Sequence, residues 1–425
     1  MEIGDTKENI VIVGGGICGL ATALALHRKG IRSVVLERSN TLRATGAAII
    51  VHPNGWRALD QLGVASHLRE TAIPILSGQF HSLNNDELKE MPVGNGGIRD
   101  KKSMDEIEMK GFDSMVVVRW KEELRCLRRT DLVDILANSL PRNTLHLGCE
   151  VLSIKLDPIT SSPVLQLQGG RLLNAKVVIG CDGVNSPISN MMGVKAEKIF
   201  TISVIRGFTS YPNGHELGSQ FRLTKKNDTQ VGQLPMTKNL VYWFITRKYT
   251  CQDSMASKSQ KLIRNLAVDS VEGFPTSIIE MAKNCELDSL HLTEYLRYHA
   301  PWDILRRRFR KGTVTLAGDA MHAMGPFLAQ GGSACLEDAI VLARCLARTT
   351  QIHRNARGTK MQVEKAFDEY LKERKMRVLR LSLQMYLIGK MLDASSQFVK
   401  FICIILLAVL FSDSHGHTRY DCGSL

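Results

Sequence analysis

The segment that most constrains the fold is IVIVGGGICG, residues 10–19. Its four apolar residues are typical of a parallel strand that is covered on both faces, and a glycine-rich turn follows at once. Helix-forming residues continue over 20–29 and end at Gly30, and a second apolar run, 33–36, ends at Glu37. The order strand, turn, helix, strand predicts a βαβ unit within about 30 residues.

The glycines of this turn predict a dinucleotide-binding site. Gly14, Gly16 and Gly19 satisfy the pattern GxGxxG between a strand and a helix. Gly14 permits the tight turn, Gly16 lets the backbone approach a pyrophosphate, and Gly19 allows close packing of helix on strand. Glu37 stands where a carboxylate can accept hydrogen bonds from ribose hydroxyls. An acid there favours an unphosphorylated ribose, and therefore FAD or NAD over NADP.

Two later apolar runs have the same character. Residues 176–180 lead into Asp182-Gly183, and residues 313–317 lead into Gly318-Asp319 and then a helical pattern over 334–347. Between them, residues 195–300 alternate like a half-buried antiparallel sheet, as in LVYWFI at 240–245. The sequence therefore predicts an α/β fold: a Rossmann-like domain assembled from separated segments, an inserted antiparallel-sheet domain and a helical C-terminus.

Composition narrows the possible partners. The formal net charge of +13 favours an anionic partner, such as nucleic acid, a membrane surface, a phosphorylated cofactor or an acidic substrate. Only 6% of the residues are aromatic, which argues against nucleic acid because base-stacking platforms need aromatic side chains. The patterns GxSxG, HExxH and the P-loop are absent from the sequence, so hydrolase, zincin and NTPase chemistry have no support.

Cysteines and termini bear on the compartment. The ten cysteines form no CxxC pair and no cluster at zinc spacing, so we expect reduced thiols, no metal site and a cytoplasmic location. The N-terminal residues show neither a signal peptide nor a transit peptide. The apolar run 401–411 is eleven residues long, whereas a spanning helix needs roughly 20. We expect it to be buried or to make a peripheral membrane contact.

Three motifs resemble those of a known family. They are GxGxxG with Glu37-Arg38 and the segment 42–63, then VVIGCDGVNSPI at 177–188, and LAGDAMHAMGPFLAQGGSACLEDA at 316–339. The chain resembles the single-component FAD-dependent aromatic hydroxylases, which include p-hydroxybenzoate hydroxylase, salicylate hydroxylase and zeaxanthin epoxidase. Among them, it looks like the plant FAD-dependent monooxygenases. With the terminal TyrAspCys at 420–422, the resemblance runs nearly from end to end.

The resemblance implies roles for individual residues. Asp319 would bind the ribityl chain of FAD, Pro326 would present a rigid surface beside the ring, and Asp182 would support both FAD and the nicotinamide donor. Gly331 and Gly332 would bring the backbone and a helix N-terminus against the flavin pyrimidine. The full set implied for non-covalent FAD binding is Gly14, Gly16, Gly19, Glu37, Arg38, Arg43, Arg129, Asp182, Asp319, Gly331 and Gly332; Pro326 and Gly331 are the implied catalytic positions, and Tyr242, Trp243 and Phe327 would face the substrate.

The chain departs from the family pattern at three positions. Ser189 stands where an arginine is usual in the second motif, which weakens the expected contact with the nicotinamide donor. Ala329 replaces a glycine in a loop that can require a positive φ. Phe327 makes the pocket mouth more apolar.

Other side chains near the cofactor are given structural roles. We expect His322 to cap local backbone and not to act as a base. Cys18 and Cys335 are expected to pack as small apolar residues near the cofactor and not to attach the flavin covalently.

The resemblance also implies a domain plan and an activity. Residues 1–75, 111–192 and 301–375 would form the FAD-binding domain, 76–110 and 193–300 the substrate domain, and 376–425 a C-terminal helical region. The implied activity is insertion of one oxygen atom from O2 into a small aromatic or phenolic substrate through a flavin hydroperoxide, with NADPH or NADH as a transient donor. The protein would act as a monomer or homodimer.

Two alternatives stay open. One is an epoxidase of an apolar isoprenoid, favoured by 401–411 and Phe327. The other is a binding protein of the same fold that has lost catalysis, supported only by Ser189 and Ala329.

Overall fold

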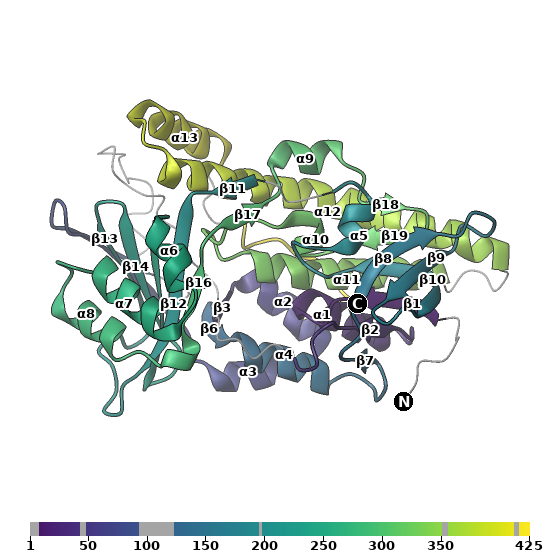
Figure 1. The fold of residues 1–425 in the computed structure, drawn as a ribbon, viewed down its shortest axis with the longest axis horizontal. Helices are drawn as coiled ribbons and strands as arrows, with labels where there is room; N and C mark the ends of the chain where they lie inside the picture. Colours follow the sequence, from purple (N-terminus) through teal and green to yellow (C-terminus); the bar gives the residue numbers. More distant parts are fainter. Residues whose placement is uncertain (1–7, 43–47, 93–122, 195–197, 351–355, 412–415) are drawn as a thin grey trace, which may run out of the picture.

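The structure of this protein is a computed structural model. It describes residues 8–42, 48–92, 123–194, 198–350, 356–411 and 416–425. The described chain forms two lobes, each built on its own sheet, with long C-terminal helices along one edge (Figure 1). This arrangement confirms the predicted α/β fold with an inserted sheet and a helical C-terminus.

The first lobe contains an eight-stranded sheet whose central strands are parallel. Val11 and Ile12 are fully buried, as expected for a strand covered on both faces. The main path of the sheet runs in the order β18 (Arg310–Lys311), β19 (Val314–Leu316), β10 (Leu172–Gly180), β1 (Glu8–Val13), β2 (Val34–Leu36) and β7 (Leu145–His146), and β8 (Val151–Leu156) and β9 (Pro163–Leu167) extend it beside β10.

The register of these strands positions the site. Val13 pairs with both Gly180 and Leu36, and Gly180 pairs with Leu316. The carboxyl ends of β1, β2, β10 and β19 are therefore level. The segments that follow these strands meet at one edge of the sheet, which is where open α/β sheets bind ligands.

Helices cover the sheet of the first lobe. Helix α1 is buried over most of its length and packs against α11. The helices of this lobe are α1 (Ile17–Arg28), α2 (Pro53–Leu62), α3 (Ala65–Thr71), α4 (Arg129–Asn138), α5 (Pro187–Met191), α9 (Pro301–Arg306), α10 (Asp319–His322), α11 (Gly331–Thr350) and α12 (Ala356–Asp393).

The second lobe contains a seven-stranded sheet. The segment 77–92 reaches it from far away in the sequence, and its strand β4 pairs in parallel with β13. The strand order is β16 (His291–Thr293), β12 (Ile202–Ser210), β15 (Leu240–Lys248), β14 (Thr229–Pro235), β13 (Gln220–Lys226), β4 (Ser77–Ser82) and β5 (Glu87–Pro92).

Three helices cover the outer face of this second sheet (Figure 1). They are α6 (Cys251–Ala256), α7 (Gln260–Ser270) and α8 (Thr276–Lys283), and the 3-10 helix η1 (Leu287–Ser289) follows them. Two short strand pairs complete the structure: β3 (Ala48–Val51) with β6 (Arg125–Arg128), and β11 (Lys198–Phe200) with β17 (Leu296–Tyr298).

The C-terminal residues pack along one edge of the molecule. Helix α12 is 38 residues long, and α13 (Gln397–Leu410) packs on its end. Residues 416–425 return to the first lobe, where Arg57 donates to the carbonyls of Arg419 and Tyr420. Among the described residues, no helix is both long enough and apolar enough to cross a membrane.

A charged cluster is fully buried between α11 and α12. The guanidinium of Arg374 lies 2.6 Å from Oε2 of Glu337 and 2.7 Å from Oδ1 of Asp338, and all three side chains are 0% exposed. Because the charges compensate one another inside the protein, removing one partner leaves buried charge that is less well compensated.

We expect Arg374→Ala to lower the free energy of unfolding by about 3–5 kcal/mol, because it removes the fully buried cation that Glu337 and Asp338 share. Urea unfolding of the FAD-free protein measures this change. The matched control is Arg310→Ala, which removes a solvent-exposed pair with Asp368 and should cost less than about 1 kcal/mol. Equal losses in the two variants would contradict the role given to the buried cluster.

Candidate active site

A cavity of about 820 Å³ lies between the two lobes. Its walls come from the turns after β1, β2, β10 and β19, from the N-terminus of α11, and from one face of the second sheet. Twelve of the fifteen different residues predicted for the site line it: Gly14, Gly16, Glu37, Arg38, Arg129, Asp182, Asp319, Gly331, Gly332, Pro326, Tyr242 and Phe327. Arg43 lies outside the described residues.

The glycine turn after β1 is shaped by close backbone contacts. Gly14 has φ +106°, and a Cβ there would lie 2.5 Å from the carbonyl oxygen of Cys181. A Cβ on Gly19 would lie 1.9 Å from the carbonyl oxygen of Gly14, so this glycine sets the close approach of α1 to the turn. A Cβ on Gly16 would meet nothing within 4 Å, which leaves open space at the point where a pyrophosphate would approach.

Glu37 is buried at the end of β2 and braces the turn. Its Oε2 accepts from the N–H of Gly15 (2.7 Å), and its Oε1 accepts from the N–H of Ser39 (3.0 Å). Each carboxylate oxygen has a further lone pair for a ribose hydroxyl. Arg38 and Arg129 bring positive charge to the same cavity, which suits a phosphate group.

Two aspartates line the cavity from adjacent strand ends. Asp319 begins α10 and is exposed, whereas both carboxylate oxygens of Asp182 are buried without a direct hydrogen bond among the described residues. Burial raises the pKa of Asp182 to about 6, although the nearby hydroxyl of Ser186, neighbouring backbone N–H groups and the positive charge of Arg38 partly offset this effect. A ligand with hydroxyl or N–H donors would satisfy the buried oxygens.

The loop before α11 and the start of this helix carry the residues that the sequence predicts to lie beside the flavin ring. Pro326, Gly331 and Gly332 line the cavity, and α11 is long enough that the N–H groups of its first turn present a positive dipole end there. Ala329 has φ +50°, so the chain places a residue with a Cβ in the left-handed region where glycine is favoured. Its N–H donates to the carbonyl of Pro326 (2.9 Å), which closes the turn.

The second sheet supplies the opposite wall. Side chains alternate along β15, so Tyr242 and Phe244 line the cavity whereas Trp243 points to the other face. Trp243 is fully buried against the outer helices, and its Nε1 donates to Oγ1 of Thr209 (2.9 Å). The prediction that Trp243 faces the substrate is therefore corrected: its parity on the strand places it in the core of the second lobe.

His322 is paired differently from the prediction. It does not cap backbone; its Nε2 lies 2.6 Å from Oδ2 of Asp338, and both side chains are fully buried. Burial lowers the pKa of His322, but the carboxylate of Asp338 raises it, and the net shift is upward. The contact with Asp338 gives His322 a structural role, and its side chain does not line the cavity.

Cys18 and Cys335, which lie near the glycine turn, are buried, and so is Ser189. Cys18 and Cys335 line the cavity floor, and a Cβ added at Gly318 would contact both. Hydrogen bonding to one neighbouring thiol, together with burial, raises the pKa of both cysteines, so they are protonated. Ser189 does not line the cavity; its hydroxyl hydrogen-bonds to the carbonyls of Val194 and Ala320.

Several lining residues were not predicted from the sequence. Arg206 on β12 pairs with Phe244 across the sheet and faces the cavity, and the alternation that includes Tyr242 could have identified it. Met391 and Leu392 at the end of α12, and His417 of the C-terminal segment, also line the cavity. These three come from parts of the chain without a local motif, so only the tertiary structure reveals them.

These observations fit an FAD molecule. The open space at Gly16, the orphaned oxygens of Asp182 and the free helix end at Gly331 lie in one cavity that continues onto an aromatic sheet face. A dinucleotide needs this combination of pyrophosphate cradle, hydroxyl acceptors and a donor-rich surface for the ring.

We expect Gly16→Ala to raise the dissociation constant for FAD at least about tenfold, which is about 1.4 kcal/mol. The added methyl group would fill space that the pyrophosphate needs. It would meet no other part of the protein, because nothing lies within 4 Å of a Cβ at this position. The thermal midpoint of the FAD-free protein should therefore not change. FAD titration followed by flavin fluorescence measures the affinity, and unchanged affinity would contradict this placement of the pyrophosphate.

Asp182 should make the FAD-free protein less stable as pH rises from 4 to 6. Its pKa is about 6 in the folded protein against 3.8 for an unperturbed aspartate, so the folded state holds the extra proton across this window. The loss is at most about 3 kcal/mol. Asp182→Asn should remove this decline in urea unfolding measured across the window; an unchanged decline would contradict the assignment.

Comparison with known proteins agrees with this geometry. Residues 7–380 match the protein family described as "FAD binding domain". The chain is 45% identical to Monooxygenase 1 of Arabidopsis thaliana over 420 residues, which is 98% of this chain and 99% of the relative. It is 32% identical to Monooxygenase 2 of the same plant over 431 residues, covering 99% and 98% of the two chains.

Solved structures share the fold. Klebsiella pneumoniae HpxO complexed with FAD and uric acid superposes with a TM-score of 0.73 at 18% identity, covering 97% of this chain and 96% of that one. For 2,6-dihydroxypyridine-3-hydroxylase of Arthrobacter nicotinovorans the TM-score is 0.70 at 16% identity, covering 92% and 94%. With the family match and the relatives above, the chain belongs to the FAD binding domain family and is an FAD-dependent monooxygenase.

Proposed function

We propose that this monooxygenase uses NADPH or NADH as a transient electron donor and inserts one oxygen atom from O2 into a small aromatic or phenolic substrate. The observation that carries the proposal is the continuity of the cavity. It runs from the glycine turn at Gly14 to a sheet face where Arg206 lies among aromatic side chains.

The residues of the first lobe would hold the cofactor. The turn at Gly14 and Gly16 would accept the pyrophosphate, Glu37 the ribose, and Asp319 the hydroxyls of the ribityl chain. The N–H groups at the start of α11 would face the pyrimidine edge of the ring, beside Pro326. When bound, FAD supplies hydride acceptance and oxygen activation, and the chain's own part is to orient the substrate and exclude water.

The second lobe would bind the substrate. Tyr242, Phe244 and Phe221 offer aromatic surfaces to a flat ring, and Arg206 offers a positive charge to a carboxylate or phenolate. Phe327 lies at the side of the cavity nearest α12, packed edge-on against Phe200 with ring centroids 5.4 Å apart. A carboxylated phenol matches this combination of flat apolar walls and one cation.

The departures from the family pattern do not remove the cofactor contacts. Ser189 is buried away from the cavity, and Ala329 keeps the turn closed with its N–H bonded to Pro326. This supports an active enzyme over a binding protein that has lost catalysis. The sequence has one GxGxxG dinucleotide-binding pattern between a strand and a helix, and FAD would occupy it. The nicotinamide donor would therefore bind transiently, without a domain of its own.

A specific observation favours a second candidate, an epoxidase of an apolar isoprenoid. Phe327, Ile388, Met391 and Leu392 make one end of the cavity wholly apolar. An elongated hydrocarbon would lie along these residues and would leave Arg206 without a partner. Substrate chemistry therefore separates the two candidates.

Compartment and assembly form part of the proposal. All ten cysteines are free in the described structure, which suits a reducing cytoplasm. We propose a monomer or homodimer there, with peripheral membrane contact through residues 401–411.

Absorbance and NADPH oxidation of the purified protein test the proposed function. We expect flavin bands and an oxidation rate that rises with a carboxylated phenol. Arg206→Gln should lower kcat/KM for that phenol about tenfold or more by raising KM, since a charged pair to the substrate is lost. The matched control is Arg222→Gln on β13, whose guanidinium bonds to Gln220 and Glu216 and does not line the cavity.

Two outcomes would contradict the proposal. Oxidation stimulated by an isoprenoid, with no dependence on Arg206, would favour the epoxidase. Bound flavin that neither nicotinamide reduces would favour the binding protein.

A further inference from the structure

Helix α13 carries a large apolar surface that no described part of the chain covers. The helix has 14 residues, and only Cys403 and Leu407 are buried among them. Eight large apolar side chains are 38–71% exposed: Phe398, Val399, Phe401, Ile402, Ile405, Leu406, Val409 and Leu410. Contiguous apolar surface of this kind is rare on monomeric proteins and marks an interaction site.

The inner side of α13 fixes the helix to the body of the protein. Cys403, Leu407 and the following Phe411 pack in one cluster with Met385 and Ile388 of α12. Figure 1 shows α13 on the outer edge of the molecule, beside the end of α12. The apolar face is thus held outward by a packed core.

Helix α9 extends the same edge. Its Trp302 and Leu305 are 41% and 54% exposed, and Trp302 meets Tyr386 of α12 edge-on, with ring centroids 5.3 Å apart. Both α9 and α13 pack on α12 and lie along the upper edge of Figure 1. Together they define an apolar edge, made of the exposed side chains of α13 with Trp302 and Leu305.

Cations outnumber acids around this apolar edge, where Asp303 pairs with Arg307 and Asp393 accepts from the hydroxyl of Thr201. Residues 394–411 contain one lysine, Lys400, and no acidic residue. Arg380 lies over the ring of Phe411, 5.7 Å from its centroid, and Lys390 is close enough to Cys403 to lower the pKa of that thiol against the larger raising effect of burial. At the end of α9, Arg306 and Arg308 are exposed.

We propose that the apolar edge binds the surface of a lipid bilayer that contains anionic lipids. A 14-residue helix is about 21 Å long, shorter than the roughly 30 Å hydrocarbon core, so α13 would lie in the plane of the interface. Its apolar side chains would enter the acyl region while the cations around it meet lipid headgroups. In a symmetric pair of copies the same cations would face one another, which disfavours self-association.

This lipid-binding proposal extends the peripheral membrane contact proposed above for residues 401–411, and its surface is separate from the catalytic cavity. None of the exposed side chains of the apolar edge lines the cavity. Loss of lipid binding and loss of cofactor or substrate binding can therefore be measured independently.

Flotation of the full-length FAD-loaded protein with lipid vesicles tests the proposal. The vesicles are phosphatidylcholine alone, or phosphatidylcholine with about a quarter phosphatidylserine. We expect the protein to float with the anionic vesicles and less with the neutral ones. The triple variant Ile402→Asp, Ile405→Asp, Val409→Asp should lower the bound fraction at least tenfold, because three charges would enter the acyl region.

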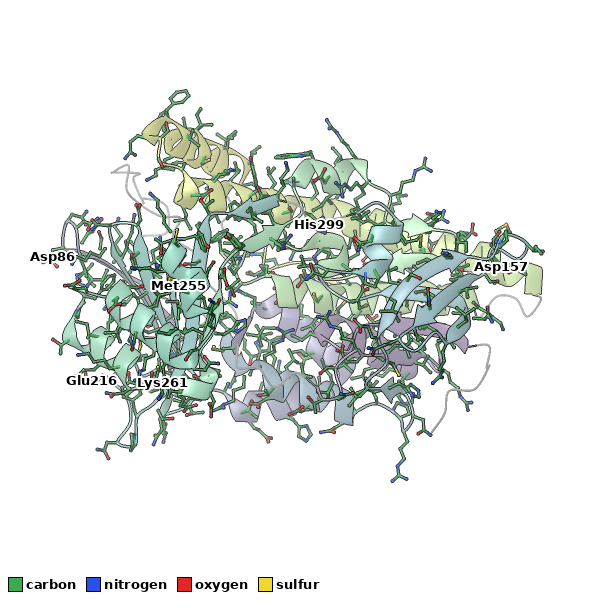
Figure 2. The ribbon with its side chains drawn as sticks, viewed as in Figure 1. Asp86, Asp157, Glu216, Met255, Lys261 and His299 are labelled. Carbon is green, nitrogen blue, oxygen red and sulfur yellow. The ribbon has the colours of Figure 1, made fainter. Side chains whose placement is uncertain are left out.

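A matched variant controls for added negative charge. Leu152→Asp, Ile159→Asp, Leu172→Asp alters side chains that are 50%, 92% and 59% exposed, in and around the β8–β9 hairpin. The turn of this hairpin, marked by Asp157 in Figure 2, lies at the other end of the molecule from α13. This control should float like the unmodified protein, and both variants should keep their FAD content and thermal midpoint.

Three results would overturn the proposal. In the first, the unmodified protein stays unbound with both vesicle types. In the second, the α13 variant floats as well as the control. In the third, the unmodified protein is a dimer, the α13 substitutions make it a monomer, and neither form binds vesicles. The last result would assign the apolar edge to a second copy of the chain.

Discussion

The carboxylate of Asp338 is the point on which the arrangement of the site depends. It is fully buried, and it accepts from Nε of Arg374 (2.7 Å), pairs with Nε2 of His322 (2.6 Å) and accepts from the N–H of Gly318 (2.8 Å). Burial raises the pKa of Asp338, but the charges of His322 and Arg374 outweigh this effect and hold the pKa at about 2. One ionised side chain thus joins α11 and α12 to the turn that presents Asp319 to the cavity.

The neighbouring carboxylate extends this connection to α2 and to the C-terminal segment. Glu337 accepts from the amide of Asn54 (2.6 Å) at the start of α2, and Asn54 also donates to Gln330 (2.9 Å) just before α11. Arg377 bridges Glu337 to the carbonyl of His417 in the C-terminal segment. Segments from four parts of the chain are therefore fixed by two adjacent acids, and hydrogen bonds in such a buried network reinforce one another.

The sequence allowed the first lobe to be predicted because its signals are local. The strand before Gly14, the acid at Glu37 and the aspartate after β19 are each defined by a few neighbouring residues. Trp243 was misplaced because burial alone does not reveal strand parity, and a shift of one residue exchanges the two faces of a sheet. The pairing of His322 with Asp338 was missed because it depends on how α11 packs on the turn, which no pattern within the sequence records.

The C-terminal part of the chain contributes more to the site than its lack of motifs suggests. The family match ends at residue 380, yet Ile388, Met391, Leu392 and His417 all line the cavity. The cofactor cradle is built from residues within the match, where the geometry needed for a dinucleotide leaves little freedom. The apolar end of the cavity combines Phe327 with residues beyond the match, on the part of α12 that also supports α13. A substrate bound at that end would therefore contact residues outside the family match, whereas the cofactor would contact residues within it.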